Sequence, residues 1–274
     1  YISKKNISKS QIYSLKKLMM ISGPDSFGHK CLRFGDNNFH LFHSRLAIFD
    51  LKSRSNQPYK FKNKILAFNG AIYNYRELKE ILISKNYKFS SESDTEVLVK
   101  MIDCFGDKAF DYLEGMWAIA IFDIKTNQLI LSRDRFGEKP LFFKRTKNGL
   151  YFASQQKYIN ILENKHPEIN KSKINTFLRF GYKSSFKNKD SFLSNIEQLY
   201  PSENLYFINN KLIKKKYWKI QIKKNHIYKR VEDCISDIKH SLIESLKLRL
   251  RSDVDCGFLL SGGIDSGSLV SISK

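Results

Sequence analysis

Apolar and polar positions follow a helical period in the first part of the chain. From Gln11 to Met20 the apolar residues recur at a spacing that predicts a helix with one buried stripe. Further helices are expected to begin at Asn74 and at Ser93, because each of these residues is followed three positions later by a glutamate, as in a capping box. Gly106 is expected to end the last of these helices.

Around and after these helices the pattern is typical of strands. Extended structure is expected over 40–51, and a short buried strand over 65–68. After Met116, short apolar segments alternate with turns, which predicts strands at 118–122, 129–132, 141–144 and 150–153. Helices followed by an antiparallel meander favour an α+β fold over a parallel sheet.

The C-terminal part predicts a change of domain. A hairpin is expected across Asn209-Asn210, and a long amphipathic helix follows after a linker near 218–228. That helix leads into an apolar segment, 254–260, which is expected to be a strand. We therefore expect one domain over residues 1–218 and the beginning of a second over 229–274. Two smaller expectations are a helix over 174–180 and a polar connection over 183–190.

Composition excludes some classes of function. No apolar run is long enough to cross a bilayer, so we expect a cytoplasmic protein with no membrane partner. The net charge of +21 comes from lysines spread along the whole chain, with one run at 214–216. We therefore expect no nucleic-acid partner. The cysteines have no metal-site spacing and are expected to be buried free thiols, namely Cys31, Cys104, Cys234 and Cys256.

One stretch near the end has the order strand, glycine-rich turn, helix. Such a turn directs backbone N–H groups at an anion, and the hydroxyls of Ser261 and Ser266 add donors. A carboxylate among phosphates requires a cation, so Asp265 suggests a bound Mg²⁺. An ordinary turn between strand and helix is the alternative. The candidate ATP-binding residues are Leu260, Ser261, Gly262, Gly263, Ile264, Asp265 and Ser266.

Several motifs occur in one order and together resemble the glutamine-hydrolysing asparagine synthetases. They are Gly23-Pro24-Asp25, His43-Ser44-Arg45-Leu46, Phe68-Asn69-Gly70-Ala71-Ile72-Tyr73-Asn74, Ser93-Asp94-Thr95-Glu96, Arg133-Asp134-Arg135-Phe136-Gly137, Phe152-Ala153-Ser154 and the loop at 260–266. The resemblance implies an N-terminal-nucleophile glutaminase domain in αββα layers. It also implies that an α/β ATP-binding domain with a pyrophosphate loop begins after it.

By this resemblance, four residues form a glutamine site. Arg45 matches the residue that binds the α-carboxylate, and Asp94 the one that binds the ammonium group. Asn69, through its side chain, and Gly70, through its backbone N–H, match the oxyanion hole. Taken singly, these residues have structural alternatives: a surface ion pair with Asp50, a helix cap and a turn.

Two further polar features are expected to be structural. Arg133-Asp134-Arg135 is interpreted as an ion-pair network without a catalytic role, and His43 as a packing or hydrogen-bonding residue rather than a base.

The resemblance implies that glutamine hydrolysis supplies ammonia to an aspartyl-AMP formed from ATP, Mg²⁺ and aspartate. Asparagine, AMP and pyrophosphate would be the products, and a homodimer is possible. The family's nucleophile is a cysteine at residue one, whereas position 1 here is tyrosine, so the chain as given is expected to hydrolyse no glutamine. With Ala71 in place of a usual glutamate, the alternative is a paralogous ligase with another carboxylate substrate and an inactive glutaminase. A basic binding module is the alternative of another class.

Overall fold

The computed structural model describes residues 1–182, 190–222 and 230–273. The expected polar connection over 183–190 and the expected linker over 218–228 lie partly outside these ranges. Up to residue 216 the chain forms two six-stranded sheets, in which all paired strands are antiparallel. The α+β prediction is therefore confirmed.

The first sheet has the order β10-β8-β9-β1-β3-β2. Its strands are β10 (Glu197–Gln198), β8 (Phe142–Thr146), β9 (Gly149–Ala153), β1 (Ile2–Ser3), β3 (Asn37–Arg45) and β2 (Ser26–Phe34). The second sheet has the order β12-β11-β7-β6-β5-β4. Its strands are β12 (Lys211–Lys216), β11 (Glu203–Ile208), β7 (Gln128–Arg133), β6 (Gly115–Asp123), β5 (Lys64–Ile72) and β4 (Tyr59–Phe61).

The two sheets pack face to face across a core of large apolar side chains. Phe39 of β3 stacks on Phe122 of β6 with ring centroids 4.3 Å apart, and both rings are buried. Fully burying one such side chain contributes about 1.5–3 kcal/mol to the stability of the fold. Because side chains alternate across a strand, the opposite faces of both sheets remain free to receive helices.

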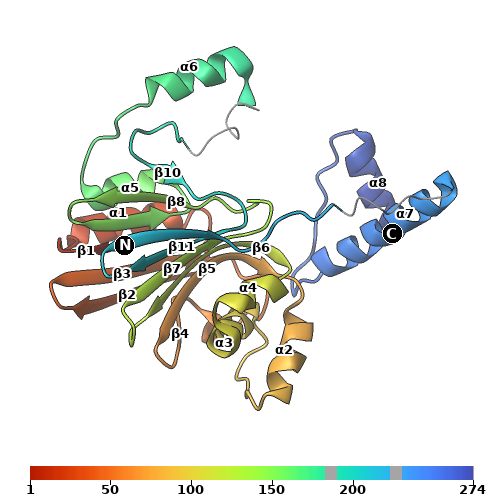
Figure 1. Ribbon diagram of the computed structural model, residues 1–274, viewed down its shortest axis with the longest axis horizontal. Coiled ribbons are helices and arrows are strands. Elements are labelled where there is room, and N and C mark those ends of the chain that lie inside the picture. The colour runs from red at the N-terminus through yellow and green to blue at the C-terminus, as the bar shows by residue number, and fades with distance from the viewer. Residues whose placement is uncertain (183–189, 223–229, 274) are drawn as a thin grey trace.

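Helices cover both outer faces, which gives the expected αββα layers (Figure 1). The first sheet is covered by α1 (Lys9–Met19) and α5 (Gln156–Glu163). The second sheet is covered by α2 (Tyr75–Ser84), α3 (Asp94–Phe105) and α4 (Ala109–Tyr112), and short 3-10 turns span Ser53–Ser55 and Gly106–Lys108. The helix expected over 174–180 is present as α6 (Lys171–Phe180), which lies away from this body.

The start of α3 is as predicted, whereas its capping box is only half formed. The Ser93 hydroxyl accepts a hydrogen bond from the N–H of Thr95, and Gly106 ends the helix with a φ of 57°. Glu96, however, does not reach back to Ser93. Its carboxylate accepts hydrogen bonds from Ser91 and forms a buried ion pair with Lys100, at 2.6 Å.

The box predicted at Asn74 is wrong. Asn74 precedes α2 as expected, but no side-chain hydrogen bond caps this helix within the described residues. The Asn74 amide instead donates to the carbonyl of Tyr112 and accepts from the N–H of Glu114. A neighbouring loop with unsatisfied backbone groups therefore competes successfully for the capping side chain.

The predicted hairpin forms across Asn209 and Asn210, which have φ values of 48° and 62°. Its second strand, β12, lies at the edge of the second sheet and carries the lysine run at 214–216. Charged side chains on an edge strand discourage pairing with another chain. The run thus has a structural explanation in the protection of an exposed sheet edge.

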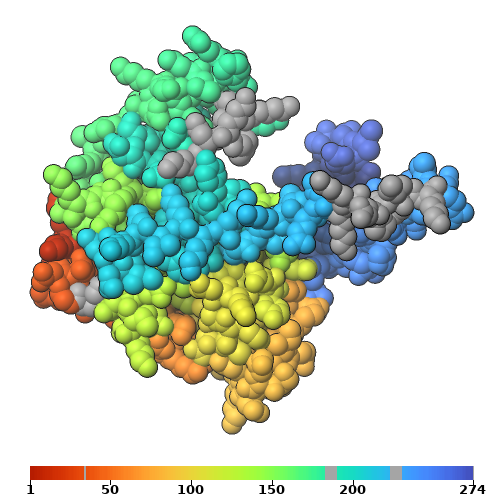
Figure 2. All heavy atoms as spheres, in the orientation of Figure 1, coloured from red at the N-terminus to blue at the C-terminus, as the bar shows by residue number. Residues whose placement is uncertain are grey.

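The C-terminal part consists of α7 (Val231–Arg249) and α8 (Ile264–Ile272), which project from the body (Figure 2). The strand expected at 254–260 does not form among the described residues, and Leu259 is 99% exposed. A strand requires a pairing partner, and the described chain provides none there. The apolar stripe of α7 is also largely exposed.

Two other predictions need correction. All the cysteines are free, but none is buried: Cys31 and Cys256 are exposed, and Cys104 and Cys234 are half-buried. Strand β2 was not predicted. It lies at the edge of its sheet, and its charged and polar residues interrupt the alternation of apolar and polar positions that is typical of a strand. No helix in the described ranges is long and apolar enough to cross a bilayer.

The core between the sheets allows a test of the packing. Replacing Phe39 by Ala is expected to lower the free energy of unfolding by about 3–5 kcal/mol, because the cavity lies between two sheets that cannot collapse onto it. The 70%-exposed Tyr13, replaced by Ala, is the control. Urea unfolding followed by circular dichroism measures both, and equal midpoints for the two variants would contradict this packing.

Candidate active site

A cavity of about 410 Å³ lies where the two sheets meet the start of α3. Strands β3, β5 and β6 form its walls, and the residues that follow β9 close one side. Every residue of the predicted glutamine site lines it, namely Arg45, Asn69, Gly70 and Asp94. The fold therefore brings together residues that come from three separate segments of the sequence.

Asn69 and Gly70 lie in β5, opposite Ala118 and Trp117 of β6. Asn69 is exposed to the cavity, and its side-chain amide donates to the Ser154 hydroxyl at 3.2 Å. Gly70 has a φ of 157°, and a Cβ at this position would lie 2.0 Å from the Met116 carbonyl oxygen. Only glycine fits there, so the turn suggested as an alternative is in fact a closely packed strand position.

The backbone immediately before Asn69 is held from two sides. The N–H of Phe68 donates to Gln57 Oε1 at 2.7 Å, and its carbonyl accepts from Gln57 Nε2 at 3.2 Å. His43 Nε2 lies 3.0 Å from the same carbonyl. Gln57 and His43 thereby position Asn69. Gln57 could not be identified from the sequence, because a single glutamine outside any repeating pattern gives no signal.

His43 behaves as the sequence predicted, as a hydrogen-bonding residue. Burial lowers its pKa to about 4, so the imidazole is neutral near pH 7 and Nε2 donates to the Phe68 carbonyl. Its Nδ1 is buried and has no hydrogen-bond partner among the described residues.

Asp94 is the first residue of α3 and is 5% exposed. Burial raises the pKa of its carboxyl group to about 6, although the N–H groups of Ile72 and Thr95 and the charge of Arg45 oppose this shift. The Ile72 N–H donates to Oδ2 at 3.0 Å, which fixes the carboxylate against the end of β5. Asp94 is thus an anion near pH 7 whose charge is poorly compensated by the protein, and a cation would stabilise it.

Arg45 lies in the cavity wall, and its guanidinium group already donates hydrogen bonds to other groups of the protein. Its Nη1 donates to the Lys52 carbonyl and to Asn56 Oδ1, and its Nη2 donates to the carbonyls of Phe49 and Asp50. These bonds hold the loop over 46–56 around the guanidinium group. To bind a carboxylate in the bidentate manner, Arg45 would have to release some of these carbonyls.

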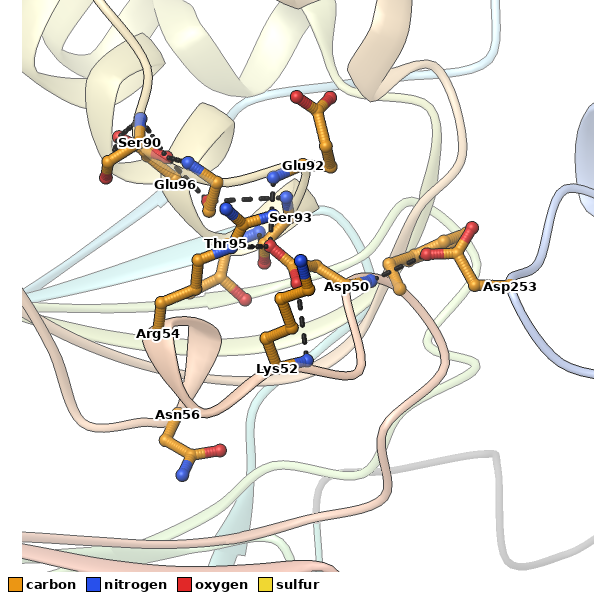
Figure 3. Close-up of polar contacts among 12 residues, drawn as sticks. Asp50, Lys52, Arg54, Asn56, Ser90, Glu92, Ser93, Thr95, Glu96 and Asp253 are labelled. Carbon is orange, nitrogen blue, oxygen red and sulfur yellow. Dashed lines mark hydrogen bonds and ion pairs between the residues drawn. The ribbon is translucent and has the colours of Figure 1, made fainter.

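The same loop is tied to the start of α3 through Asp50 (Figure 3). Its buried carboxylate accepts from Arg54 Nε at 2.8 Å and from the Glu92 N–H at 2.9 Å, and further hydrogen bonds lower its pKa against the effect of burial. The backbone of Asp50 also contacts the C-terminal part. Its N–H donates to Asp253 Oδ2 at 2.7 Å, and the Asp253 N–H donates to the Ile48 carbonyl at 2.9 Å.

The predicted ion-pair network at 133–135 is held by the backbone. Arg133 donates to the carbonyls of Gly137, Lys139 and Leu199. The fully buried Asp134 accepts from several N–H groups, including that of Lys139, which lines the cavity. The expectation of a structural role fits, but the partners are backbone groups rather than side-chain charges.

The loop at 260–266 is separate from this cavity. Helix α8 begins at Ile264 after Gly263, and no side chain in the described ranges caps its first turn. Gly262 has a φ of 80°, and the hydroxyls of Ser261 and Ser266 lie 3.1 Å apart. Uncapped N–H groups beside two hydroxyls fit a phosphate.

The loop fits a Mg²⁺ ion only together with a phosphate. No group of three His, Cys, Asp or Glu side chains is arranged around a metal position in the part of the chain that the structure describes. Asp265, in the first turn of α8, offers a single carboxylate. Mg²⁺ is commonly held by one or two carboxylates together with substrate phosphates, so the donor set matches a phosphate-bound ion.

Comparisons with known proteins support the order of the two parts. Residues 1–218 match the family described as glutamine amidotransferase domain, and residues 237–274 match asparagine synthase. A putative asparagine synthetase [glutamine-hydrolyzing] 2 of Methanocaldococcus jannaschii is 32% identical, over 98% of this chain and 55% of its own length. Asparagine synthetase [glutamine-hydrolyzing] 1 of Bacillus subtilis is 32% identical, over 96% of this chain and 40% of its own.

Among solved structures, the glutamine phosphoribosylpyrophosphate amidotransferase of B. subtilis, complexed with ADP and GMP, has a TM-score of 0.49. It is 20% identical, over 67% of this chain and 35% of that one. The chain spans about half the length of the curated relatives it matches. On the family match, the chain belongs to the glutamine amidotransferases, in the arrangement of the glutamine-hydrolysing asparagine synthetases, in which an asparagine synthase domain follows.

Proposed function

We propose that the cavity binds glutamine, and that the protein to which the chain belongs is a glutamine-dependent asparagine synthetase. One observation carries the proposal: the four residues matched to a glutamine site converge on one cavity from separate segments. In the proposed reaction, hydrolysis of glutamine supplies ammonia. The ammonia reacts with an aspartyl-AMP made from aspartate and ATP, and the products are asparagine, AMP and pyrophosphate.

Each residue has a role that follows from its surroundings. The Asp94 carboxylate would receive the ammonium group of glutamine, which supplies the missing cation. The Asn69 amide and the Gly70 N–H would donate to the oxygen that becomes negative when the side-chain carbonyl is attacked. One such donor typically lowers the barrier by about 3–4 kcal/mol. Arg45 would attract the α-carboxylate, with partial release of the loop over 46–56.

The nucleophile does not come from the four cysteines, all of which the structure describes. None of them lines the cavity. Binding and hydrolysis of glutamine are therefore separable in this chain, and we propose that it binds glutamine without hydrolysing it.

The loop at 260–266 is proposed to bind ATP. The N–H groups at the start of α8 would receive phosphate oxygens, and Asp265 would hold the Mg²⁺ ion that neutralises them. Aspartate recognition is inferred from the family alone. A cytoplasmic location and a homodimeric state are likewise proposed on that basis only.

Ala71 favours a second candidate, a ligase of the same architecture that acts on another carboxylate. This residue follows Gly70 directly and is 1% exposed, so its methyl group adds no charged or polar contact to the site. A pyrophosphate-release assay on the full-length protein with a panel of carboxylates distinguishes the two candidates. Release with aspartate alone supports the synthetase.

Replacing Asp94 by Asn tests the glutamine site. Because the ammonium group loses its anionic partner, we expect glutamine affinity to fall by about tenfold or more, equivalent to roughly 1.4 kcal/mol. The exposed Asp111, replaced by Asn, is the matched control. Isothermal titration measures binding, and a parallel glutamate assay should show no hydrolysis by the unaltered chain. Unchanged affinity in the Asp94→Asn variant would remove the basis of the proposal.

The pH dependence gives a separate test. The pKa of Asp94 is raised to about 6 in the free protein, so below this pH binding must displace a proton before the ammonium group meets an anion. We expect glutamine affinity to be constant above pH 7 and to fall by about tenfold per pH unit below pH 6. In the Asp94→Asn variant the affinity should not vary over this range. A flat profile for the unaltered chain would count against the role of Asp94.

Replacing Asp265 by Asn tests the phosphate loop. We expect the variant to lose the part of ATP affinity that depends on Mg²⁺, because the single carboxylate near the phosphates is gone. Asp255 replaced by Asn is the control, since it lies before the loop. Titration of a non-hydrolysable ATP analogue with and without Mg²⁺ measures the effect. If Mg²⁺ strengthens binding equally in both variants, Asp265 is not its ligand.

A further inference from the structure

A nucleophile with two imidazoles in line lies on the β2–β3 hairpin. Cys31 and His40 face each other across the hairpin, and His29 is two residues before Cys31 on the same face of β2. Cys31 Sγ lies 3.5 Å from His40 Nε2. His40 Nδ1 lies 3.0 Å from His29 Nε2. The order thiol, imidazole, imidazole is that of a nucleophile, a base and a group that orients the base.

The imidazole of His40 is fixed, whereas the thiol is accessible. His40 is 5% exposed and stacks on the ring of Tyr1, with centroids 5.0 Å apart and planes 2° apart. His29 in turn stacks on Phe42 at 4.2 Å. Cys31, by contrast, is exposed, on the edge strand of the first sheet. A reagent can thus reach the sulfur without moving the base.

The hydrogen bonds between the rings decide what His40 can do. When Nδ1–H donates to His29 Nε2, the lone pair of His40 Nε2 points at the thiol and can take its proton. Burial, together with the neighbouring His29, lowers the pKa of His40 to about 4, so the ring is neutral near pH 7 and its Nε2 lone pair is free to accept a hydrogen bond from the thiol. His29 then holds the Nδ1–H of the charged imidazolium.

We propose that Cys31 is a covalent modification site whose thiol, assisted by His40 and His29, exchanges with small-molecule disulfides. In this step the sulfur of Cys31 attacks one sulfur of the disulfide. A new S–S bond forms, the old one breaks, and the proton of Cys31 passes through His40 to the thiolate that leaves. The added disulfide is the oxidant, and no other co-reactant is needed. His40 also lines the cavity of the proposed glutamine site, whereas Cys31 and His29 do not.

Cys256 provides a control within the same molecule. It is also exposed, but its sulfur lies near the carbonyl oxygens of Leu250 and Val254, at 3.9 and 4.0 Å, rather than near an imidazole. The folded protein would be treated with glutathione disulfide at pH 7, and the modification of each cysteine followed by peptide mass spectrometry. We expect Cys31 to react at least tenfold faster than Cys256.

Variants separate chemistry from packing. His40→Phe keeps an aromatic ring against Tyr1 but removes the base, and should reduce the rate at Cys31 to that at Cys256. His29→Phe removes the acceptor for Nδ1–H and should lower the rate about threefold, whereas His29→Gln retains an acceptor and should restore it. The rate at Cys256 and the circular dichroism spectrum report an intact fold.

Equal rates at the two cysteines of the unaltered protein would overturn the proposal, as would an unchanged rate at Cys31 in a folded His40→Phe variant. If His40→Phe unfolds, failure of His29→Gln to restore the rate lost in His29→Phe overturns it.

Discussion

The arrangement of the charged residues around the cavity depends on the buried carboxylate of Asp50. It connects the loop over 46–56, which surrounds Arg45, to the Glu92 N–H, two residues before Asp94. A buried carboxylate is stable only when hydrogen bonds replace its water, and the bonds from Arg54 and Glu92 do this. The two ends of the proposed glutamine site, positive and negative, are therefore positioned by one anion that lies outside the cavity lining.

The same loop is one of the places where the C-terminal part contacts the body of the molecule. Asp253 contacts the backbone of Ile48 and Asp50, and Arg251 forms an ion pair with Glu77 of α2. Asp253 and Arg251 lie seven and nine positions before the loop at 260–266. The proposed phosphate loop is thus connected, through Asp253, to the same backbone segment that surrounds Arg45 of the proposed glutamine site.

Much of this organisation could be predicted from local patterns, and the failures have a common physical cause. Ser93 and Gly106 bound α3 as expected, because each acts on backbone groups within its own turn. Asn74 does not cap α2, because its side chain bonds instead to a loop that is distant in sequence but adjacent in space. Residues 254–260 form no strand, because a strand needs a pairing partner from elsewhere in the chain. The motifs correctly grouped the cavity residues. They did not show that Arg45 is already bonded to its own loop, or that Gln57 supports Phe68, since both depend on contacts across the fold.

The support behind Asn69 also has a dynamic consequence. The amide hydrogen of Phe68 is donated to a side chain, Gln57 Oε1, rather than to a neighbouring strand. Its exchange with deuterium therefore requires Gln57 to move away, whereas exchange at amides bonded within the ladder requires the strands to separate. This one backbone position reports how often the wall of the cavity loosens while the sheet itself stays closed.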